Sequence, residues 1–339
     1  MDNVLSIIFN DSHLKDGNEE EVYESVVHMV NYAVKNKIKN FIFAGDLFDS
    51  RSFQRQKQLT TLNKILDLFQ KNNLILYLFP GNHDKTLYSS ADSFLDAYKH
   101  HPCVRFNKHI KRIEIDGVTI DLLPFFSDDK LVPMLDKAEG ADVLISHFEM
   151  KGSSHLGKIS KKQNITKKLL SKWKKVYLGH YHNHHEISKD IVHLPSFRQE
   201  NFGEDNVKGF ALLKKDLSYE LIKGQFKEYI KVSVDASTLS TKKIKQLADK
   251  YKNSNESIRI EFKGTESQCK SIDKTLFEGT GIDVKLKYDE IYDTIDVVPS
   301  KIIQKYDKND ILNSFKDFCK EKKYDLKRGN SLLQEFLNK

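Results

Sequence analysis

Side chains that could bind metal ions follow five apolar segments of the sequence, each at the point where the segment ends. They belong to Asp11-Ser12-His13, Gly45-Asp46-Leu47-Phe48-Asp49, Gly81-Asn82-His83-Asp84, His147 and Gly179-His180-Tyr181-His182. Ligand-binding loops of α/β sheets converge at the carboxyl ends of the strands, so we expect these side chains to meet at one place. Each motif alone is weak evidence, because glycine and aspartate also mark ordinary turns. Their ordered succession predicts a common site.

The donor types favour a pair of divalent cations. A carboxylate can bridge two cations, while histidine and asparagine fill the remaining positions without adding excess negative charge. Two ions about 3.5 to 4 Å apart can then hold both a hydroxide and a phosphate ester. The sequence therefore predicts a two-metal phosphoesterase whose motifs centre on Asp11, Asp46, Asn82, His147 and His180.

Alternating strand and helix patterns place these motifs in an α/β fold. Apolar runs at 4–9, 40–45 and 74–81 are typical of strands, and residues 20–36 and 54–71 have helical periodicity. Short strand patterns then dominate as far as about residue 226. This pattern indicates two sheets packed face to face and flanked by helices.

The sequence changes character after Glu228. A compact β-α-β-α-β unit is indicated by alternating strand and helix patterns, at 230–235, 241–252, 257–263, 268–277 and 283–288. Residues 300–339 carry two apolar stripes at helical spacing, one from Ile311 to Cys319 and one from Leu332 to Leu337. We expect two terminal helices there, packed either on a partner or on their own domain.

The composition is that of a soluble globular protein. Of the 339 residues, 39% are hydrophobic and 30% are charged, and no apolar run approaches the roughly 20 residues that cross a bilayer. The N-terminal segment lacks the basic region and the small-residue cleavage site of a signal peptide. Three widely spaced cysteines form neither a disulfide framework nor a zinc site. We therefore expect a cytoplasmic protein without a membrane span.

Positive charge is concentrated in one segment of a chain whose net charge is +7. Nine lysines and no acidic residue occur from 151 to 175: Lys151, Lys158, Lys161, Lys162, Lys167, Lys168, Lys172, Lys174 and Lys175. A solvated surface is one interpretation. The position of the segment between His147 and His180 favours contact with a nucleic-acid backbone instead, in particular by Lys158, Lys161, Lys162, Lys167 and Lys168.

The five motifs resemble those of the calcineurin-like metallophosphoesterases, whose pattern is D-x-H, G-D-x-x-D, G-N-H-D/E, a later H and G-H-x-H. All five elements occur here in that order. The resemblance implies one ion held by Asp11, His13 and His182. It implies a second ion held by Asn82, His147 and His180, with Asp46 bridging the two.

The same resemblance assigns catalytic roles to the third motif. It implies that His83 contacts the substrate phosphate and protonates the leaving oxygen, and that Asp84 orients the His83 ring. Asp49 is expected behind the metal ligands.

Within that superfamily the chain resembles the SbcD-type nucleases, the metal-dependent subunits of the SbcC–SbcD DNA repair complex and its relatives. The similarity lies in GDLFDSR, PGNHD and LPSFRQENFGEDNVKGF, although Leu194-Pro195-Ser196 lacks the glycine of the relatives. This resemblance implies two manganese ions, 3′ to 5′ exonuclease action on double-stranded DNA ends, and endonuclease action on single strands or hairpins. It also implies a coiled-coil ATPase partner bound by the C-terminal helices.

The expected architecture is a four-layer α/β/β/α sandwich with a small α/β capping domain and C-terminal helices. We assign the nuclease domain to residues 1–228, the DNA-binding capping domain to 229–298 and the ATPase-binding segment to 299–339. A homodimer is left open. The expected location is the cytoplasm of a bacterium, or of the host if the protein is encoded by a phage.

Three other functions stay open. The same core could serve as a stand-alone phosphodiesterase for small nucleotides, which would have no use for the lysine segment or the extra domains. A protein phosphatase fits the third motif and the small cap less well. A DNA-end-binding scaffold for an ATPase is the third, and the intact set of ligands argues against it.

Overall fold

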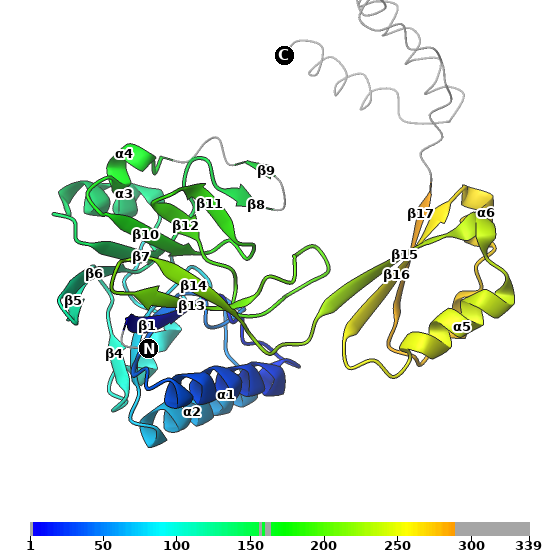
Figure 1. The fold of residues 1–339 in the computed structure, drawn as a ribbon, viewed down its shortest axis with the longest axis horizontal. Helices are drawn as coiled ribbons and strands as arrows, with labels where there is room; N and C mark the ends of the chain where they lie inside the picture. Colours follow the sequence, from blue (N-terminus) through cyan, green and yellow to red (C-terminus); the bar gives the residue numbers. More distant parts are fainter. Residues whose placement is uncertain (1–2, 156–157, 160–163, 289–339) are drawn as a thin grey trace, which may run out of the picture. The chain divides into compact units, whose positions relative to one another are not determined.

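The computed structural model describes residues 3–155, 158–159 and 164–288. These residues form two large sheets and a separate small sheet, with helices packed on each (Figure 1). The expected C-terminal helices at 299–339 lie outside the described residues, as does the end of the segment assigned to the capping domain. No helix among the described residues is long and apolar enough to cross a membrane.

The first large sheet carries the first three motifs. Its strand order is β14-β13-β1-β2-β3-β4, in which β1 to β4 run parallel and β13 and β14 run antiparallel to their neighbours. The strands are β1 (Val4–Phe9), β2 (Asn40–Ala44), β3 (Ile75–Phe79), β4 (Val104–Phe106), β13 (Gly209–Lys214) and β14 (Tyr219–Lys223). Helices α1 (Glu19–Lys35) and α2 (Gln56–Lys71) connect the first three, and the short helix η1 (Phe94–Tyr98) precedes β4.

The second large sheet carries the last two motifs. Its order is β11-β12-β10-β7-β6-β5, with parallel pairing from β6 through β7 and β10 to β12. The strands are β5 (Lys111–Ile115), β6 (Val118–Leu123), β7 (Val143–His147), β10 (Lys175–Gly179), β11 (His185–Ser188) and β12 (Ile191–His193). Between them lie α3 (Asp128–Lys137), the two-residue strands β8 (Ser154–His155) and β9 (Lys158–Ile159), and α4 (Lys167–Leu170).

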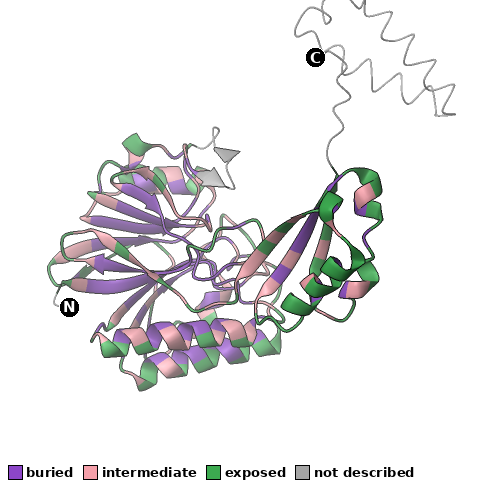
Figure 2. Ribbon diagram, turned by 45° about the vertical axis from the view of Figure 1, so that its right-hand side comes forward, coloured by how far each residue is buried: buried purple, intermediate pink, exposed green. Residues whose placement is uncertain are grey.

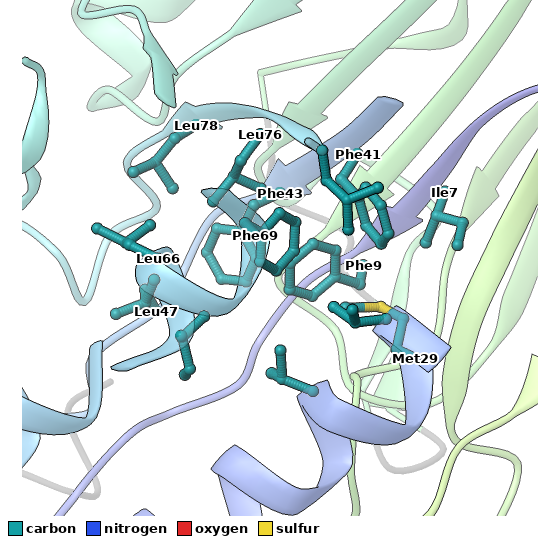
Figure 3. Close-up of a cluster of buried hydrophobic side chains, with 14 of the residues drawn as sticks. Ile7, Phe9, Met29, Phe41, Phe43, Leu47, Leu66, Phe69, Leu76 and Leu78 are labelled. Atoms are coloured by element: carbon teal, nitrogen blue, oxygen red, sulfur yellow. The ribbon is translucent and has the colours of Figure 1, made fainter. Parts of the chain in front are cut away.

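Alternation of apolar side chains along the strands produces the layers. In β2, Phe41 and Phe43 point to one face of the sheet, where they pack with Phe69 of α2 (Figure 3). Ile42 and Ala44 point to the other face. The second face packs against the second sheet. A third cluster lies between that sheet and α3 and α4. Helices α1 and α2 bury one stripe and expose the other (Figure 2). The expected four-layer α/β/β/α sandwich is thus confirmed.

The small sheet has its own core. Strands β15 (Tyr229–Asp235), β16 (Ser257–Gly264) and β17 (Asp283–Tyr288) alternate with α5 (Thr241–Tyr251) and α6 (Glu266–Lys270), as the sequence predicted. The short helix η2 (Ala236–Thr238) follows β15. The second helix is shorter than expected, because it ends at Lys270 and a separate turn, η3 (Lys274–Phe277), completes the segment. Apolar side chains of the strands and of α5, α6 and η3 pack together in one cluster.

The first core cluster gives a stability prediction. The Phe69 side chain on α2 is fully buried, whereas Leu59 on the same helix is 37% exposed. We expect Phe69→Ala to lower the free energy of unfolding by about 3–5 kcal/mol, because it removes a large side chain and leaves a cavity. Leu59→Ala should change it by about 0.5 kcal/mol or less. Chemical denaturation followed by circular dichroism measures both, and equal effects would contradict the assigned burial.

Candidate metal centre

The strand ends of both large sheets bring the five motifs together. The loops after β1 and β2 run side by side, because Asp11 N–H donates to Gly45 O at 3.0 Å and His13 N–H to Asp46 O at 3.2 Å. In the second sheet His147 and Gly179 are directly paired across β7 and β10. The parallel strands therefore end at a shared edge, as the sequence predicted.

Asp11, His13 and His182 form the first ligand group. One ligand atom from each lies within 4.8 Å of the others. The two Nε2 atoms of His13 and His182 are 3.1 Å apart, and each lies 3.7 to 3.9 Å from Asp11 Oδ1. Asp11 Oδ1 is buried and has no hydrogen-bond partner among the described residues. A buried carboxylate oxygen surrounded by imidazole nitrogens fits a bound cation.

Asn82, His147 and His180 form the second group. Asn82 Oδ1 lies 3.1 Å from His147 Nε2 and 2.9 Å from His180 Nδ1. Asp46 Oδ2 lies 3.1 Å from His147 Nε2 and 3.8 Å from His13 Nε2, so Asp46 faces both groups. The structure therefore brings all seven sequence-predicted ligands together, with Asp46 in the position expected of a bridge. Their binding of metal remains a prediction.

Partners behind the imidazoles select which nitrogen faces the site. His147 Nδ1 donates to Ala44 O at 2.7 Å, which leaves Nε2 for a cation. His182 Nδ1 lies 2.8 Å from Glu204 Oε1, which leaves its Nε2 likewise. Hydrogen bonds of this kind orient metal-binding histidines and raise their basicity.

Glycines precede three of the motifs because the loops approach too closely for a side chain. A Cβ at Gly81 would lie 2.4 Å from Asp46 N, and one at Gly179 would lie 2.7 Å from Ala44 O. A Cβ at Gly45 would lie 2.6 Å from His147 Nδ1. The motif glycines thus let the ligand loops of the two sheets touch one another.

Four of the predicted ligands have a left-handed backbone. The φ angles are 52° at Asp11, 42° at His13, 59° at Asp46 and 87° at His180. Residues other than glycine seldom adopt this conformation, and strain of this kind accumulates at functional sites. The hydrogen bonds between the loops maintain it here.

The charges of this cluster are balanced internally. Burial alone would raise the pKa of Asp46, but the nearby His147 outweighs it and lowers that pKa to about 2. Burial alone would lower the pKa of His147, but Asp46 and Asp11 outweigh it and raise that pKa to about 9. Burial and the neighbouring His147 lower the pKa of His180 to about 4. Divalent cations bound at the site would replace a protonated His147 as the source of positive charge beside Asp46 and Asp11.

The structure corrects the role of Asp84. Its buried carboxylate does not orient His83, because it accepts hydrogen bonds from four backbone N–H groups: those of Asp46, Leu47, Phe48 and Gly81, at 2.9 to 3.0 Å. Consecutive residues in this tight turn point in different directions, which the sequence does not reveal. Burial, with the charge of Asp46, raises the pKa of Asp84 to about 6.

His83 lies beside the ligands and is oriented by a different group. Its ring Nδ1 is 2.6 Å from the backbone oxygen of Asp49, and its backbone N–H donates to Asp46 Oδ1 at 2.8 Å. The Asp49 carboxylate lies 3.7 Å from His13 Nδ1, the ring nitrogen other than the one nearest Asp11 and Asp46. A cleft of about 520 Å³ opens over His83 and over ligands from both groups.

Sequence reasoning missed Glu204 and Lys208. Glu204 holds His182 from behind, and its side chain is only 3% exposed. Lys208, also buried, lies 3.4 Å from Glu204 and donates to the backbone oxygen of His182 at 2.5 Å. Both belong to the stretch LPSFRQENFGEDNVKGF, which the resemblance singled out without assigning them a role.

The lysine segment is partly occupied by structural contacts. Lys172 donates to the backbone oxygens of Leu135 and Ala138 at the end of α3. Lys174 pairs with Asp142 and Lys175 with Asp190. Of the lysines expected to contact DNA, Lys161 and Lys162 lie outside the described residues, as does the side chain of Lys158. Lys167 donates to Ile187 O and Lys168 is exposed.

The contact between Glu204 and His182 gives a test of metal binding. We expect Glu204→Ala to weaken the binding of divalent manganese by about 10- to 100-fold, because His182 loses the partner that orients it. Glu204→Gln, which keeps an acceptor oxygen, should lose less. Calorimetric titration measures the affinity, and circular dichroism monitors folding. Glu220→Gln, on an exposed carboxylate, is the matched control. Equal affinities of Glu204→Ala and the unaltered chain would contradict the proposed arrangement.

Comparison with known proteins agrees with this geometry. The model of the calcineurin-like phosphoesterase family matches residues 6–222, more than half of the chain, and that region contains both ligand groups. Exonuclease subunit 1 of Enterobacteria phage T4 is 26% identical over 165 residues, which are 47% of this chain and 48% of that protein. This chain therefore spans about half the length of that relative. A solved structure covers 66% of the chain at 9% identity and a TM-score of 0.40, a likeness that carries no inference. With its motifs, layers and family match in agreement, the chain belongs to the calcineurin-like phosphoesterases.

Proposed function

We propose that this phosphoesterase is a metal-dependent nuclease that hydrolyses phosphodiester bonds of DNA. The observation that carries the proposal is the pair of ligand groups facing Asp46, with His83 beside them in one open cleft. The similarity to a phage protein named as an exonuclease subunit supports the choice of substrate.

Each ligand group would hold one divalent ion, and Asp46 would contact both. Ions bound there would supply Lewis acidity and would lower the pKa of bound water toward neutral pH. The nitrogen and oxygen donors accept manganese, iron or zinc. We propose manganese, on the resemblance to SbcD-type nucleases.

His83 would act on the leaving group. Its Nδ1 is engaged by the backbone oxygen of Asp49, so Nε2 is the nitrogen available to a substrate. A proton on that nitrogen can pass to the departing ribose oxygen. We further propose 3′ to 5′ exonuclease action on double-stranded ends and endonuclease action on single strands or hairpins, in DNA repair, recombination or replication.

A pair of substrates separates the metal ligands from the proton donor. With manganese and end-labelled duplex DNA, Asp46→Asn should lower the rate by about a thousandfold or more, and His83→Ala by about 10²- to 10⁴-fold. Bis(p-nitrophenyl) phosphate has a leaving group that needs no proton. We therefore expect His83→Ala to lose much less on this ester, whereas Asp46→Asn loses activity on both substrates. Glu220→Gln serves as the control.

Other outcomes would point to other functions. Unchanged digestion of DNA by Asp46→Asn would defeat the proposed site. Hydrolysis of the small ester and of cyclic nucleotides without cleavage of any DNA would favour a phosphodiesterase for small nucleotides. Binding of DNA ends without hydrolysis of either substrate would favour the scaffold.

The second proposal concerns a partner. We propose that residues 299–339 bind a coiled-coil ATPase, as the resemblance implies, and that the complex works in the cytoplasm. If so, an ATPase encoded nearby should co-purify with the full chain, and Phe315→Asp should abolish co-purification because it places a charge in the apolar stripe. Asn313→Asp, in the same segment, is the control. Retention of the ATPase by Phe315→Asp would contradict the proposal.

A further inference from the structure

Two loops that carry residues of the candidate metal centre also carry exposed hydrophobic side chains. Loop 49–55 leads from Asp49 into α2, and its Phe53 side chain is 56% exposed. Loop 82–93 follows Asn82 and His83, and its Leu87 side chain is 65% exposed. Leu87 is the most exposed large hydrophobic residue among the described residues. Burying either side chain against a ligand would be favourable.

Arg51 ties the two loops together. Its guanidinium lies 3.8 Å from the centre of the Tyr88 ring, and its Nε donates to the backbone oxygen of Lys85 at 3.5 Å. Arg51 thus stacks on loop 82–93 while it belongs to loop 49–55. A second tie is the contact between His83 Nδ1 and Asp49 O. The loops therefore form one surface, which we name the loop platform, and Phe53 and Leu87 are part of it.

A series of rings connects the loop platform to a metal ligand. The Tyr88 ring packs edge-on against Phe125, with centroids 4.9 Å apart. Phe125 in turn lies stacked against His180 at 6.5 Å. Fully buried Lys85 fixes this arrangement, because its Nζ donates to Phe125 O at 2.6 Å and to Ser90 O at 3.0 Å. The position of the loop platform relative to the centre is thus set by packing.

Both exposed side chains closely follow residues of the cleft in the sequence. Phe53 is four residues from Asp49, and Leu87 is four residues from His83. A fully extended chain spans at most about 14 Å over four residues, which limits the distance between the Cα atoms in each pair. A strand whose phosphate occupies the cleft would place its neighbouring nucleotides within that reach.

The chemistry of the loop platform fits a nucleic-acid strand. Bases offer flat apolar faces and the backbone offers negative charge, so binding surfaces for unpaired strands combine apolar or aromatic side chains with cations. Here Arg51 accompanies the two hydrophobic side chains, and the Arg55 guanidinium lies 5.9 Å from the centre of the Phe53 ring. Single exposed hydrophobic residues are ordinary elsewhere, as Val34 on α1 shows. Phe53 and Leu87 differ from Val34 because their loops also carry cleft residues and make contacts with arginine side chains.

We propose that Phe53 and Leu87 contact the bases of an unpaired DNA strand beside the phosphate that is cleaved. The inference rests on the proposed nuclease function and makes it more specific. The loop platform would favour ends or loops whose bases are free over fully paired DNA. Arg51 acts as a positioning residue that holds the two loops together.

Paired substrates test the contact with the bases. Activity is measured with manganese on a single-stranded oligonucleotide and on an abasic oligonucleotide of the same length. We expect Phe53→Ala and Leu87→Ala to lower the ratio of kcat/KM between normal and abasic strands by about fivefold or more, because only the normal strand offers a base to stack. Phe53→Trp should restore the ratio. Val34→Ala, at the far end of α1 from the ligand loops, should leave the ratio unchanged.

The outcomes are distinguishable from failure of the proposed function. If the unaltered chain hydrolyses bis(p-nitrophenyl) phosphate but cleaves no oligonucleotide, the nuclease proposal and this inference both fail. If it cleaves oligonucleotides and the variants keep the same ratio, the contact with bases alone is overturned, and a protein partner becomes the better occupant of the loop platform. An equal loss on normal and abasic strands would also overturn it, because it would indicate a structural role.

Discussion

The buried carboxylate of Asp84 is the contact on which the candidate metal centre depends. It accepts hydrogen bonds from four backbone N–H groups, three in the loop after β2 and one at Gly81 after β3. These hydrogen bonds hold Asp46 in its left-handed conformation and join its loop to that of Asn82 and His83. Buried backbone donors need partners, and a carboxylate with two oxygens can satisfy several at once. The residue next to His83 thus serves the architecture of the site, while Asp49 orients the His83 ring.

The second sheet is attached to this arrangement through backbone oxygens. His147 donates to Ala44 O at the end of β2, and Gly179 passes so close to the same oxygen that no side chain fits. His193, fully buried, contacts Gly179 O at 3.0 Å and Ser153 Oγ at 2.8 Å, and so fixes the strand end from which His180 projects. Each sheet supplies residues to the second ligand group, Asn82 from the first sheet and His147 and His180 from the second. The site therefore exists only when the two sheets are packed face to face.

The sequence predicted the parts of the site that depend on strand ends. Ligands such as Asp11 and His147 directly follow apolar runs, and strand ends of a parallel sheet share one edge, so their convergence follows from local patterns. Glu204 had no such signal. It reaches His182 because loop 199–208 folds back, through a hydrogen bond from Gln199 Nε2 to Glu204 O at 3.0 Å. The partners of Asp84 were equally hidden, because backbone amides leave no mark in a sequence.

The lysine segment illustrates a limit of reasoning from charge. A run of lysines indicates positive potential only if their charges are unpaired, and Lys174 and Lys175 pair with the carboxylates of Asp142 and Asp190. Exposed ion pairs contribute little stability, yet they cancel the field that would attract DNA. The proposal of DNA contact therefore rests on the surroundings of the cleft more than on Lys172, Lys174 and Lys175. There Arg51 stacks on Tyr88, and the loops that carry Phe53 and Leu87 also carry the cleft residues Asp49 and His83.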